Sequence, residues 1–237
     1  MERTFRVLRF DPEKDEKTYF QEYQVPARDG MTVLEGLFYI QRRLDPSLAF
    51  RFSCRGSVCG SCAMNTNGRN RLGCETQVSS LKGVIKVRPL GHLKVMRDLV
   101  VELDGFWEKY KRVRPYLIPS SPYPEKETLQ SPEERGMIGD SADCILCANC
   151  HGSCAVTGTD SDYLGPAALL KTDRFLRDSR DMAVDERIRI VDGVHGIWRC
   201  HSILSCQDVC PKELSPTSSI MEIRKRMFRM AKKDGRG

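Results

Sequence analysis

The sequence predicts an α+β protein, in which a mixed domain of strands and one helix comes first and an all-α domain follows. Alternating apolar and polar residues open the chain, as in a strand, whereas apolar residues in the second half recur at helical spacing. Eleven cysteines lie in both halves, ten of them in three tight clusters. We therefore expect one domain over residues 1–104 and a second over residues 105–237, each holding cysteine-bound cofactors.

The first domain is expected to begin with a hairpin and a helix. Residues 4–10 and 19–25 alternate apolar and polar side chains and predict two strands. Thr32 and Glu35 have the spacing of a capping box, so a helix should start there. It should end at Asp45, which precedes a proline.

Turn residues and prolines predict the elements that follow. Asn67-Gly68 predicts a tight hairpin turn, and residues 84–87 predict a closing strand. The apolar residues within 93–107 have helical spacing and predict a helix. Residues 115–124 hold four prolines and predict a connector with little regular structure.

The second domain should contain at least three further helices. A small residue followed by proline marks each expected start, because proline suits the first helical position. These starts are Ser131-Pro132, Gly165-Pro166 and Ser215-Pro216.

The cysteine usage indicates reduced, intracellular, metal-bound thiols. An odd number of clustered cysteines does not suit a disulfide framework. The opening MERTFRVLRF carries charges throughout, unlike a secretory signal. No apolar run approaches the roughly 20 residues that span a bilayer.

The formal net charge of +6 first suggests an anionic partner such as nucleic acid or anionic lipid. That count treats cysteine as neutral, whereas metal-bound cysteine is a thiolate. Three oxidised iron–sulfur clusters with their ligands would carry about −2 each and nearly cancel the surplus. We therefore expect no nucleic-acid partner.

The first cysteine group matches a plant-type [2Fe-2S] site. Cys54, Cys59 and Cys62 have the C-x4-C-x2-C spacing, and Cys74 follows as the distant fourth ligand. The small residues between them allow the backbone to approach the cluster closely. Zinc, the alternative, needs two ligand pairs on separate knuckles, and Cys54 and Cys74 do not form a second pair along the sequence.

The second group is the run of bacterial ferredoxins. Cys144, Cys147, Cys150 and Cys154 have the C-x2-C-x2-C-x3-C spacing. In two-cluster ferredoxins the fourth cysteine of such a run binds the other cluster.

The third group repeats this run with one position changed. Cys200, Cys206 and Cys210 occupy its first, third and fourth positions, and Ile203 stands where the second cysteine would be. An aliphatic side chain cannot bind iron, so one cluster should have three thiolates and lack one corner iron.

The crossover rule then assigns the remaining ligands. The expected [4Fe-4S] ligands are Cys144, Cys147, Cys150 and Cys210, and the expected [3Fe-4S] ligands are Cys154, Cys200 and Cys206. The alternative is a fourth iron completed by water or hydroxide beside Ile203. With this assignment all eleven cysteines are used.

Other signals do not indicate catalysis on this chain. No histidine spacing fits a Rieske site. His201 follows Cys200 directly, and its alternative is an ordinary surface or packing histidine. No G-x-G-x-x-G after a strand, P-loop or nucleophile–base pair is present, so we expect no catalytic residue.

The C-terminal tail is basic. Residues 221–237 hold seven Lys or Arg against two acidic residues. On an amphipathic helix this net +5 could meet anionic lipid headgroups or a membrane partner, or it could be a solvated basic end.

These motifs, in this order, resemble the iron–sulfur subunits of succinate dehydrogenase and fumarate reductase over essentially the whole chain. They are S-C-R-G-S-V-C-G-S-C at 53–62, N-G-R-N-R-L-G-C at 67–74, D-C-I-L-C-A-N-C at 143–150, G-P-A-A-L at 165–169, R-F-L-R-D-S-R-D at 174–181 and C-H-S-I-L-S-C-Q-D-V-C-P-K at 200–212.

The resemblance implies a β-grasp [2Fe-2S] ferredoxin-like domain followed by an all-α [4Fe-4S]/[3Fe-4S] ferredoxin-like domain. It implies electron transfer between a flavoprotein subunit, which carries FAD and handles succinate or fumarate, and a membrane quinone. The other partners would be integral membrane anchor subunits, usually with haem b. The resemblance implies that the chain lies at the cytoplasmic face of a bacterial inner membrane or at the matrix face of the mitochondrial inner membrane.

The resemblance also places His201 and Ile203 near the quinone. Many ubiquinone-reducing members have proline at the position of Ala155 and a tryptophan pair soon after, and residues 156–163 contain neither. This loop is more similar to those of menaquinone-linked members.

Two other functions remain open from the sequence alone. One is a subunit of a soluble or differently anchored fumarate- or heterodisulfide-type reductase. The other is a zinc-stabilised nucleic-acid-binding protein. Copurifying subunits would separate the first alternative from a quinone oxidoreductase, and metal analysis would separate the second.

Overall fold

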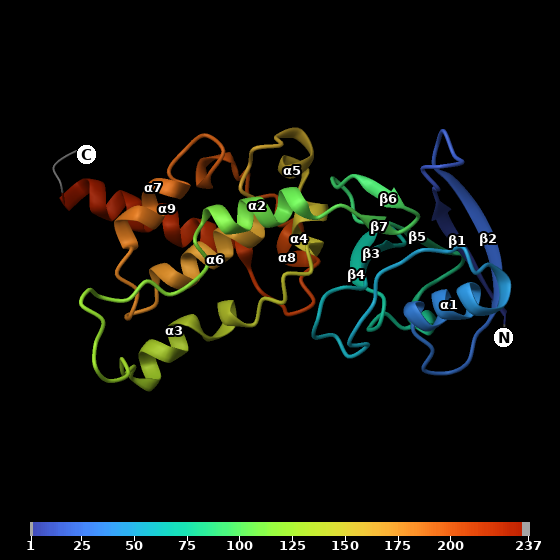
Figure 1. The fold of residues 1–237 in the computed structure, drawn as a ribbon, viewed down its shortest axis with the longest axis horizontal. Helices are drawn as coiled ribbons and strands as arrows, with labels where there is room; N and C mark the ends of the chain where they lie inside the picture. Colours follow the sequence, from blue (N-terminus) through green and yellow to red (C-terminus); the bar gives the residue numbers. More distant parts are fainter. Residues whose placement is uncertain (1, 234–237) are drawn as a thin grey trace. The chain divides into compact units, whose positions relative to one another are not determined.

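The expected N-terminal hairpin is confirmed. In the computed structural model, which describes residues 2–233, β1 (Glu2–Arg9) pairs antiparallel with β2 (Tyr19–Pro26) (Figure 1). The described residues form two units. The first combines residues 2–103 with Ile145–Ser153, and the second combines Asp104–Cys144 with residues 154–233.

The first unit is built on a five-stranded mixed sheet in the order β2-β1-β5-β3-β4. The further strands are β3 (Ala63–Thr66), β4 (Arg69–Leu72) and β5 (Ile85–Arg88). Asn67-Gly68 forms the turn between β3 and β4, as predicted. β5 runs parallel to β1, which makes the sheet mixed.

The capping box predicted at Thr32 and Glu35 is present and starts α1 (Val33–Tyr39). A π-helical turn (Ile40–Leu44) continues it to Asp45, and a 3-10 turn (Val78–Ser80) follows later. A Cβ at Gly36 would lie 2.3 Å from the Phe5 ring, so α1 packs directly on β1. The core of the first unit therefore lies between α1 and the sheet.

The prediction of one helix over residues 93–107 is wrong in its first part. β6 (Val95–Arg97) and β7 (Val100–Val101) form a small hairpin, and α2 (Asp104–Arg112) begins only after it. Asp98 has a left-handed φ of 47°, and its carboxylate accepts hydrogen bonds from the backbone N–H groups of Phe10 and Ala49. These long-range bonds favour a turn over the helix that the apolar spacing predicts.

A buried arginine connects the strands of the first unit to this turn. Arg9 is 5% exposed, and its Nε donates to Asp98 at 2.9 Å. The same guanidinium donates to Asp45 and Tyr23, and to Ser47 at 2.8 Å. Burial alone would lower the pKa of the Arg9 guanidinium. Its hydrogen bonds to Asp98 and Asp45 outweigh this effect and hold the pKa above its usual range.

Asp45→Asn is expected to weaken the acid sensitivity of the first unit. Burial alone would raise the pKa of Asp45, but hydrogen bonds from Ser47, Tyr23 and Arg9 outweigh it and hold that pKa well below its usual range. The stabilisation is therefore present above the unfolded-state pKa of about 3.9 and is lost as the pH falls toward the folded-state value.

We expect the urea midpoints of the wild type and of Asp45→Asn to differ most near neutral pH and to converge below about pH 4. Comparing them at each pH cancels the acid lability of bound clusters, which both share. A difference that stays constant from neutral to acid pH would contradict the assignment.

Residues 145–153 pack with the first unit. Ile145 and Cys147 contact its hydrophobic core. The Nδ2 of Asn70 donates to the backbone oxygen of Asn149 at 3.1 Å, and this bond joins β4 to α4 (Asn149–Ser153). This packing comes from contacts that are distant in sequence.

The second unit is helical, as predicted, and α6 packs against α9. Its remaining elements are α3 (Pro132–Ala142), α5 (Ala155–Thr159), α6 (Pro166–Leu176), α7 (Val184–Val191), a 3-10 turn (Ile197–Arg199), α8 (Ser205–Asp208) and α9 (Pro216–Lys233). The three predicted starts are confirmed. The proline-rich connector between α2 and α3 lacks helices and strands, as expected.

Arg187 of α7 holds this connector. It is 1% exposed, and its guanidinium forms hydrogen bonds of 2.6 and 3.0 Å to Asp181. It also donates to the carbonyl oxygens of Val113, Arg114 and Tyr116 at 3.0, 2.7 and 2.7 Å. All five guanidinium N–H groups are therefore used.

Candidate metal centres

The loop that carries the first cysteine group turns several backbone N–H groups toward sulfur. The N–H groups of Gly56, Val58 and Cys59 donate to the Sγ of Cys54 at 3.3, 3.4 and 3.3 Å. Such successive N–H groups form a concavity that favours anions. The loop is therefore suited to thiolates and to the sulfides of a cluster.

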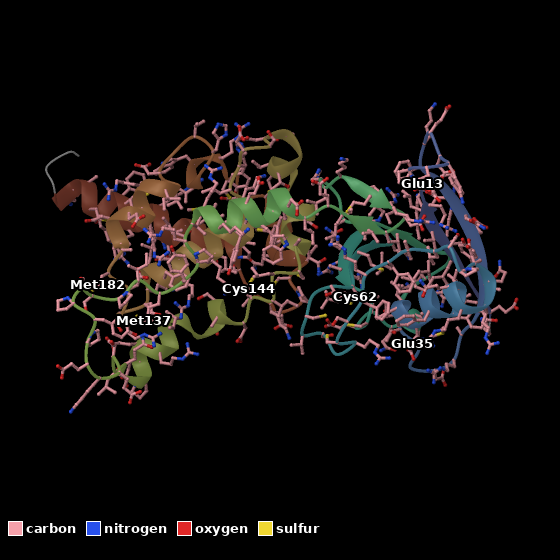
Figure 2. The ribbon with its side chains drawn as sticks, viewed as in Figure 1. Glu13, Glu35, Cys62, Met137, Cys144 and Met182 are labelled. Carbon is pink, nitrogen blue, oxygen red and sulfur yellow. The ribbon has the colours of Figure 1, made fainter. Side chains whose placement is uncertain are left out.

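The four sulfurs of this group lie as two pairs. Cys59 is hydrogen-bonded to Cys54, and Cys62, labelled in Figure 2, is hydrogen-bonded to Cys74. The pKa of the Cys59 thiol is lowered to about 6, chiefly by the hydroxyl of Ser61, whereas burial raises that of Cys62 to about 12. Two pairs of thiolates fit a rhomb of two irons, with one pair on each iron.

A single zinc ion fits this arrangement poorly. Zn–S bonds of about 2.3 Å in a tetrahedron place the sulfurs roughly 3.8 Å apart, in one compact group. Among the described residues, and within either unit, no three cysteines bring their sulfurs within 4.8 Å of one another.

Gly60 brings this loop against the second cysteine run inside the first unit. Its φ is +74°, and a Cβ there would lie 2.7 Å from the Cβ and 2.8 Å from the Cα of Cys147. Only glycine meets both requirements. Two cysteine groups that are far apart in the sequence are thus in direct contact through one residue.

The second and third runs share a backbone pattern. Leu146 and Ala148 have left-handed φ values of 54° and 61°, two and four residues after Cys144. Ser202 and Leu204 have φ values of 54° and 69°, at the same two steps after Cys200. This repeat supports the alignment that places Ile203 opposite Cys147.

Cys147 and Cys150, two of the predicted four-iron ligands, belong to the first unit. Cys144, labelled in Figure 2, and Cys210 belong to the second. Asn149 is fully buried, and neither its Nδ2 nor its Oδ1 has a hydrogen-bond partner. A buried amide without a partner beside two cysteines fits a bound group nearby.

The second unit brings together the three cysteines predicted for the [3Fe-4S] site. Cys154, Cys200 and Cys206 line one pocket, and His201 and Ile203 line it as well. Burial raises the pKa of the Cys206 thiol. Ile203 is 55% exposed, so the pocket lies near the protein surface.

Sequence reasoning missed two polar residues of this pocket. Tyr163 is buried and lines the pocket beside Cys200, and burial, followed by the charges of the three cysteines, raises the pKa of its phenol far above the usual range. Thr217 is buried 3.3 Å from the Sγ of Cys206. No local pattern marks either residue.

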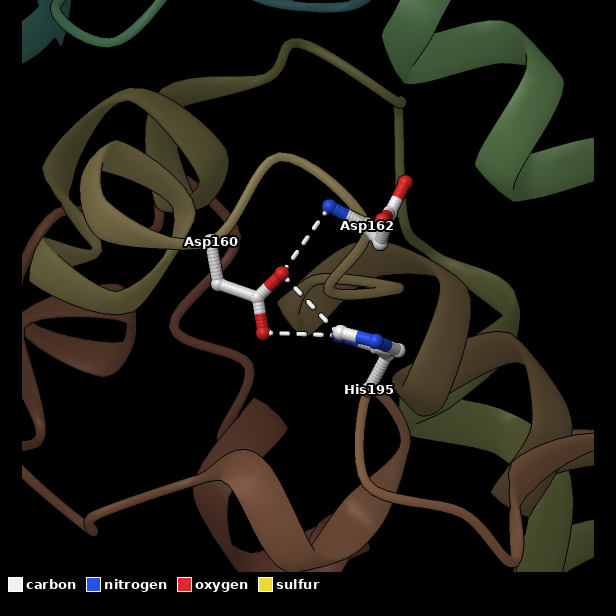
Figure 3. A group of neighbouring side chains, drawn as sticks. All are labelled: Asp160, Asp162 and His195. Carbon is white, nitrogen blue, oxygen red and sulfur yellow. Dashed lines mark hydrogen bonds and ion pairs between the residues drawn. The ribbon is translucent and has the colours of Figure 1, made fainter.

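Asp160 joins the loop after α5 to the segment that precedes Cys200. Its carboxylate accepts from His195 Nδ1 at 3.0 and 2.9 Å and from the N–H of Asp162 at 3.0 Å (Figure 3). Arg199 Nε also donates to it at 2.9 Å. The His195 bond, ahead of the others, lowers the pKa of Asp160. With Arg199 as a partner this group is an ion-pair network rather than a cation site.

The C-terminal tail is helical as far as the structure describes it. α9 extends through Lys233, and residues 234–237 lie outside the described residues. None of the described helices is both long enough and apolar enough to cross a bilayer.

Comparisons with known proteins identify the kind of domain in each half of the chain. Residues 4–108 match the 2Fe-2S iron-sulfur cluster binding domain, and residues 140–214 match the 4Fe-4S dicluster domain. The chain is 41% identical to the succinate dehydrogenase iron-sulfur subunit of Coxiella burnetii, covering 95% of this chain and 97% of that one.

It is also 42% identical to the mitochondrial succinate dehydrogenase [ubiquinone] iron-sulfur subunit of Dictyostelium discoideum, covering 93% of this chain and 80% of that one. In structure it resembles a chain of the Mycobacterium smegmatis Sdh1 complex in the apo form, with a TM-score of 0.88, 27% identity and 95% of each chain covered. The chain therefore belongs to the family of succinate dehydrogenase iron–sulfur subunits.

Proposed function

We propose that this chain relays electrons between the FAD of a flavoprotein partner and a membrane quinone through three clusters. The proposed ligands are Cys54, Cys59, Cys62 and Cys74 for [2Fe-2S], Cys144, Cys147, Cys150 and Cys210 for [4Fe-4S], and Cys154, Cys200 and Cys206 for [3Fe-4S]. Bound clusters supply one-electron chemistry, and the chain supplies their positions. The proposed domains span residues 1–104 and 105–237.

The observation that carries this proposal is the contact between Gly60 and Cys147. Electron transfer weakens steeply with distance, so two centres that exchange electrons should lie close together. Gly60 lies between two ligands of the first group, and Cys147 is a ligand of the second. The chain thus provides a short path between the first two clusters.

A basic groove beside Cys74 supports the flavoprotein as the partner of the first unit. Its volume is about 860 Å³, and it is lined by Arg28, Arg42, Arg43 and Arg55 together with Cys74. Such a groove suits an acidic surface of a partner and brings that partner to the [2Fe-2S] ligands.

Exposed apolar side chains of the second unit support a membrane anchor and a quinone, which we propose to be menaquinone, as its partners. Ile203 is 55% and Phe228 65% exposed, and Phe228 stacks edge-to-face on Trp198. Arg224 lies over the Trp198 ring. An apolar surface edged with arginine fits an anchor subunit at the membrane interface. His201 would face the quinone, and haem b would belong to the anchor.

We place the chain peripherally on the cytoplasmic face of a bacterial inner membrane, or the matrix face of the mitochondrial one. The test is purification of the intact complex. We expect about nine irons with acid-labile sulfide per chain, no stoichiometric zinc, a copurifying flavoprotein and integral membrane subunits. The complex should couple succinate and fumarate to quinone and quinol. A colourless, zinc-loaded chain would contradict the proposal.

Ile203→Cys is expected to convert the three-iron site toward four irons, because it supplies a thiolate for the empty corner. Oxidised complex should then lose most of its three-iron electron paramagnetic resonance signal. Leu204→Cys is the matched control: it adds an exposed cysteine one residue out of register and should leave the signal intact. An unchanged signal in Ile203→Cys would count against the ligand assignment.

A further inference from the structure

Two buried hydroxyl groups reach the three-cysteine pocket from different parts of the second unit. Tyr163 is 1% exposed and lies in the loop between α5 and α6. Thr217 is 6% exposed and lies in the first turn of α9. Neither belongs to the proposed ligand set, so their polar groups need another explanation.

Each hydroxyl contacts a different cysteine. Tyr163 lines the pocket together with Cys200, near enough for its phenol to interact with that sulfur, and the Oγ1 of Thr217 lies 3.3 Å from the Sγ of Cys206. A free thiol could donate or accept in such a contact. A thiolate bound to iron has no proton, so the hydroxyl must be the donor in both bonds.

These bonds favour the reduced cluster. Reduction adds negative charge that spreads onto the ligand sulfurs, and an O–H donor stabilises that charge. Both donors are buried, where water competes little and the local dielectric constant is low. Hydrogen bonds to the sulfurs of a cluster are one of the means by which proteins set its potential.

We propose that Tyr163 and Thr217 are positioning residues that raise the reduction potential of the cluster held by Cys154, Cys200 and Cys206. They do so by donating O–H···S hydrogen bonds to two of its three ligands. This inference rests on the proposed function. The last cluster before the membrane would thereby hold an electron more tightly than its cysteines alone allow.

The test is a redox titration of the intact complex, monitored through the three-iron resonance signal. Tyr163→Phe and Thr217→Val each remove one hydroxyl at nearly constant shape. Each should lower the equilibrium constant for reduction about tenfold, which is about 59 mV for one electron, and the double variant should show the larger shift.

Thr172→Val is the matched control. Thr172 is fully buried in α6, and its hydroxyl donates to the Ala168 carbonyl oxygen at 3.1 Å, so the potential should not move. Thr217→Ser keeps a hydroxyl and should retain most of the wild-type potential. A merely structural role of Thr217 would not distinguish Ser from Val in this way.

Wild-type complex without a three-iron signal would overturn the proposed function, and this inference with it. A normal signal with unchanged potentials in both variants would overturn the inference alone. The unaltered complex gives a second measurement in case a variant assembles poorly. Exchange into D2O should shift the iron–thiolate stretching frequencies of this cluster, and unshifted frequencies would contradict O–H donation.

Discussion

Replacing Arg187 by methionine is expected to lower the free energy of unfolding of the second unit by about 3–5 kcal/mol. Asp181 is 5% exposed and would become an unpaired buried carboxylate. The carbonyl oxygens of Val113, Arg114 and Tyr116 would lose their donor at the same time. Urea unfolding followed by far-ultraviolet circular dichroism would measure the change.

Lys225→Met is the matched control in the same unit. Its ion pair with Glu222 spans 2.6 Å on α9, with side chains 57% and 40% exposed. Exposed pairs contribute below about 1 kcal/mol, so little change is expected. Equal losses in the two variants would refute a special role for Arg187. The free energy of unfolding of Arg187→Lys should be closer to that of Arg187→Met than to that of the wild type, because lysine lacks the planar five-donor fork.

Gly60→Ala is expected to lower the free energy of unfolding of the first unit by about 2–5 kcal/mol and to reduce cluster content. A left-handed φ costs a non-glycine residue roughly 1–2 kcal/mol, and overpacking adds about 1–3 kcal/mol. The collision partners are the Cα and Cβ of Cys147, at 2.8 and 2.7 Å, which cannot move as a flexible side chain would. Iron analysis and urea midpoints would record both effects.

Gly68→Ala separates the two causes. Gly68 has a φ of +86° but nothing within 4 Å of a Cβ, so only the backbone penalty applies. We expect a loss of about 1–2 kcal/mol and full iron content. If Gly60→Ala behaved like Gly68→Ala, the contact with Cys147 would have no energetic importance.

Features determined by neighbours along the chain could be predicted from the sequence. The capping box at Thr32 depends on a glutamate three residues later and is present, and the helix start at Ser131-Pro132 is present as well. The Asn67-Gly68 turn likewise needs only its own two residues. The cysteine spacings belong to the same class, because three ligands on one short loop must follow a fixed pattern.

Features determined by distant contacts could not be predicted. The apolar spacing of residues 93–107 predicts a helix, yet hydrogen bonds from Phe10 and Ala49 to Asp98 fix a turn in its first part. Tyr163 and Thr217 meet the cysteine pocket only after α5, α6 and α9 have packed. Nothing in the local sequence of either residue marks it as a neighbour of sulfur.

The packing of Ile145–Ser153 with the first unit has a consequence for biosynthesis. A ribosome that has released only residues 1–104 has not yet delivered the segment that packs against this unit's core. Ile145 and Cys147 emerge after the whole connector and α3, so the part of the core surface that they contact stays uncovered until then. Chaperones and cluster-loading factors would therefore encounter an N-terminal half without these two contacts. Proteolytic fragments ending near residue 104 would lack them permanently.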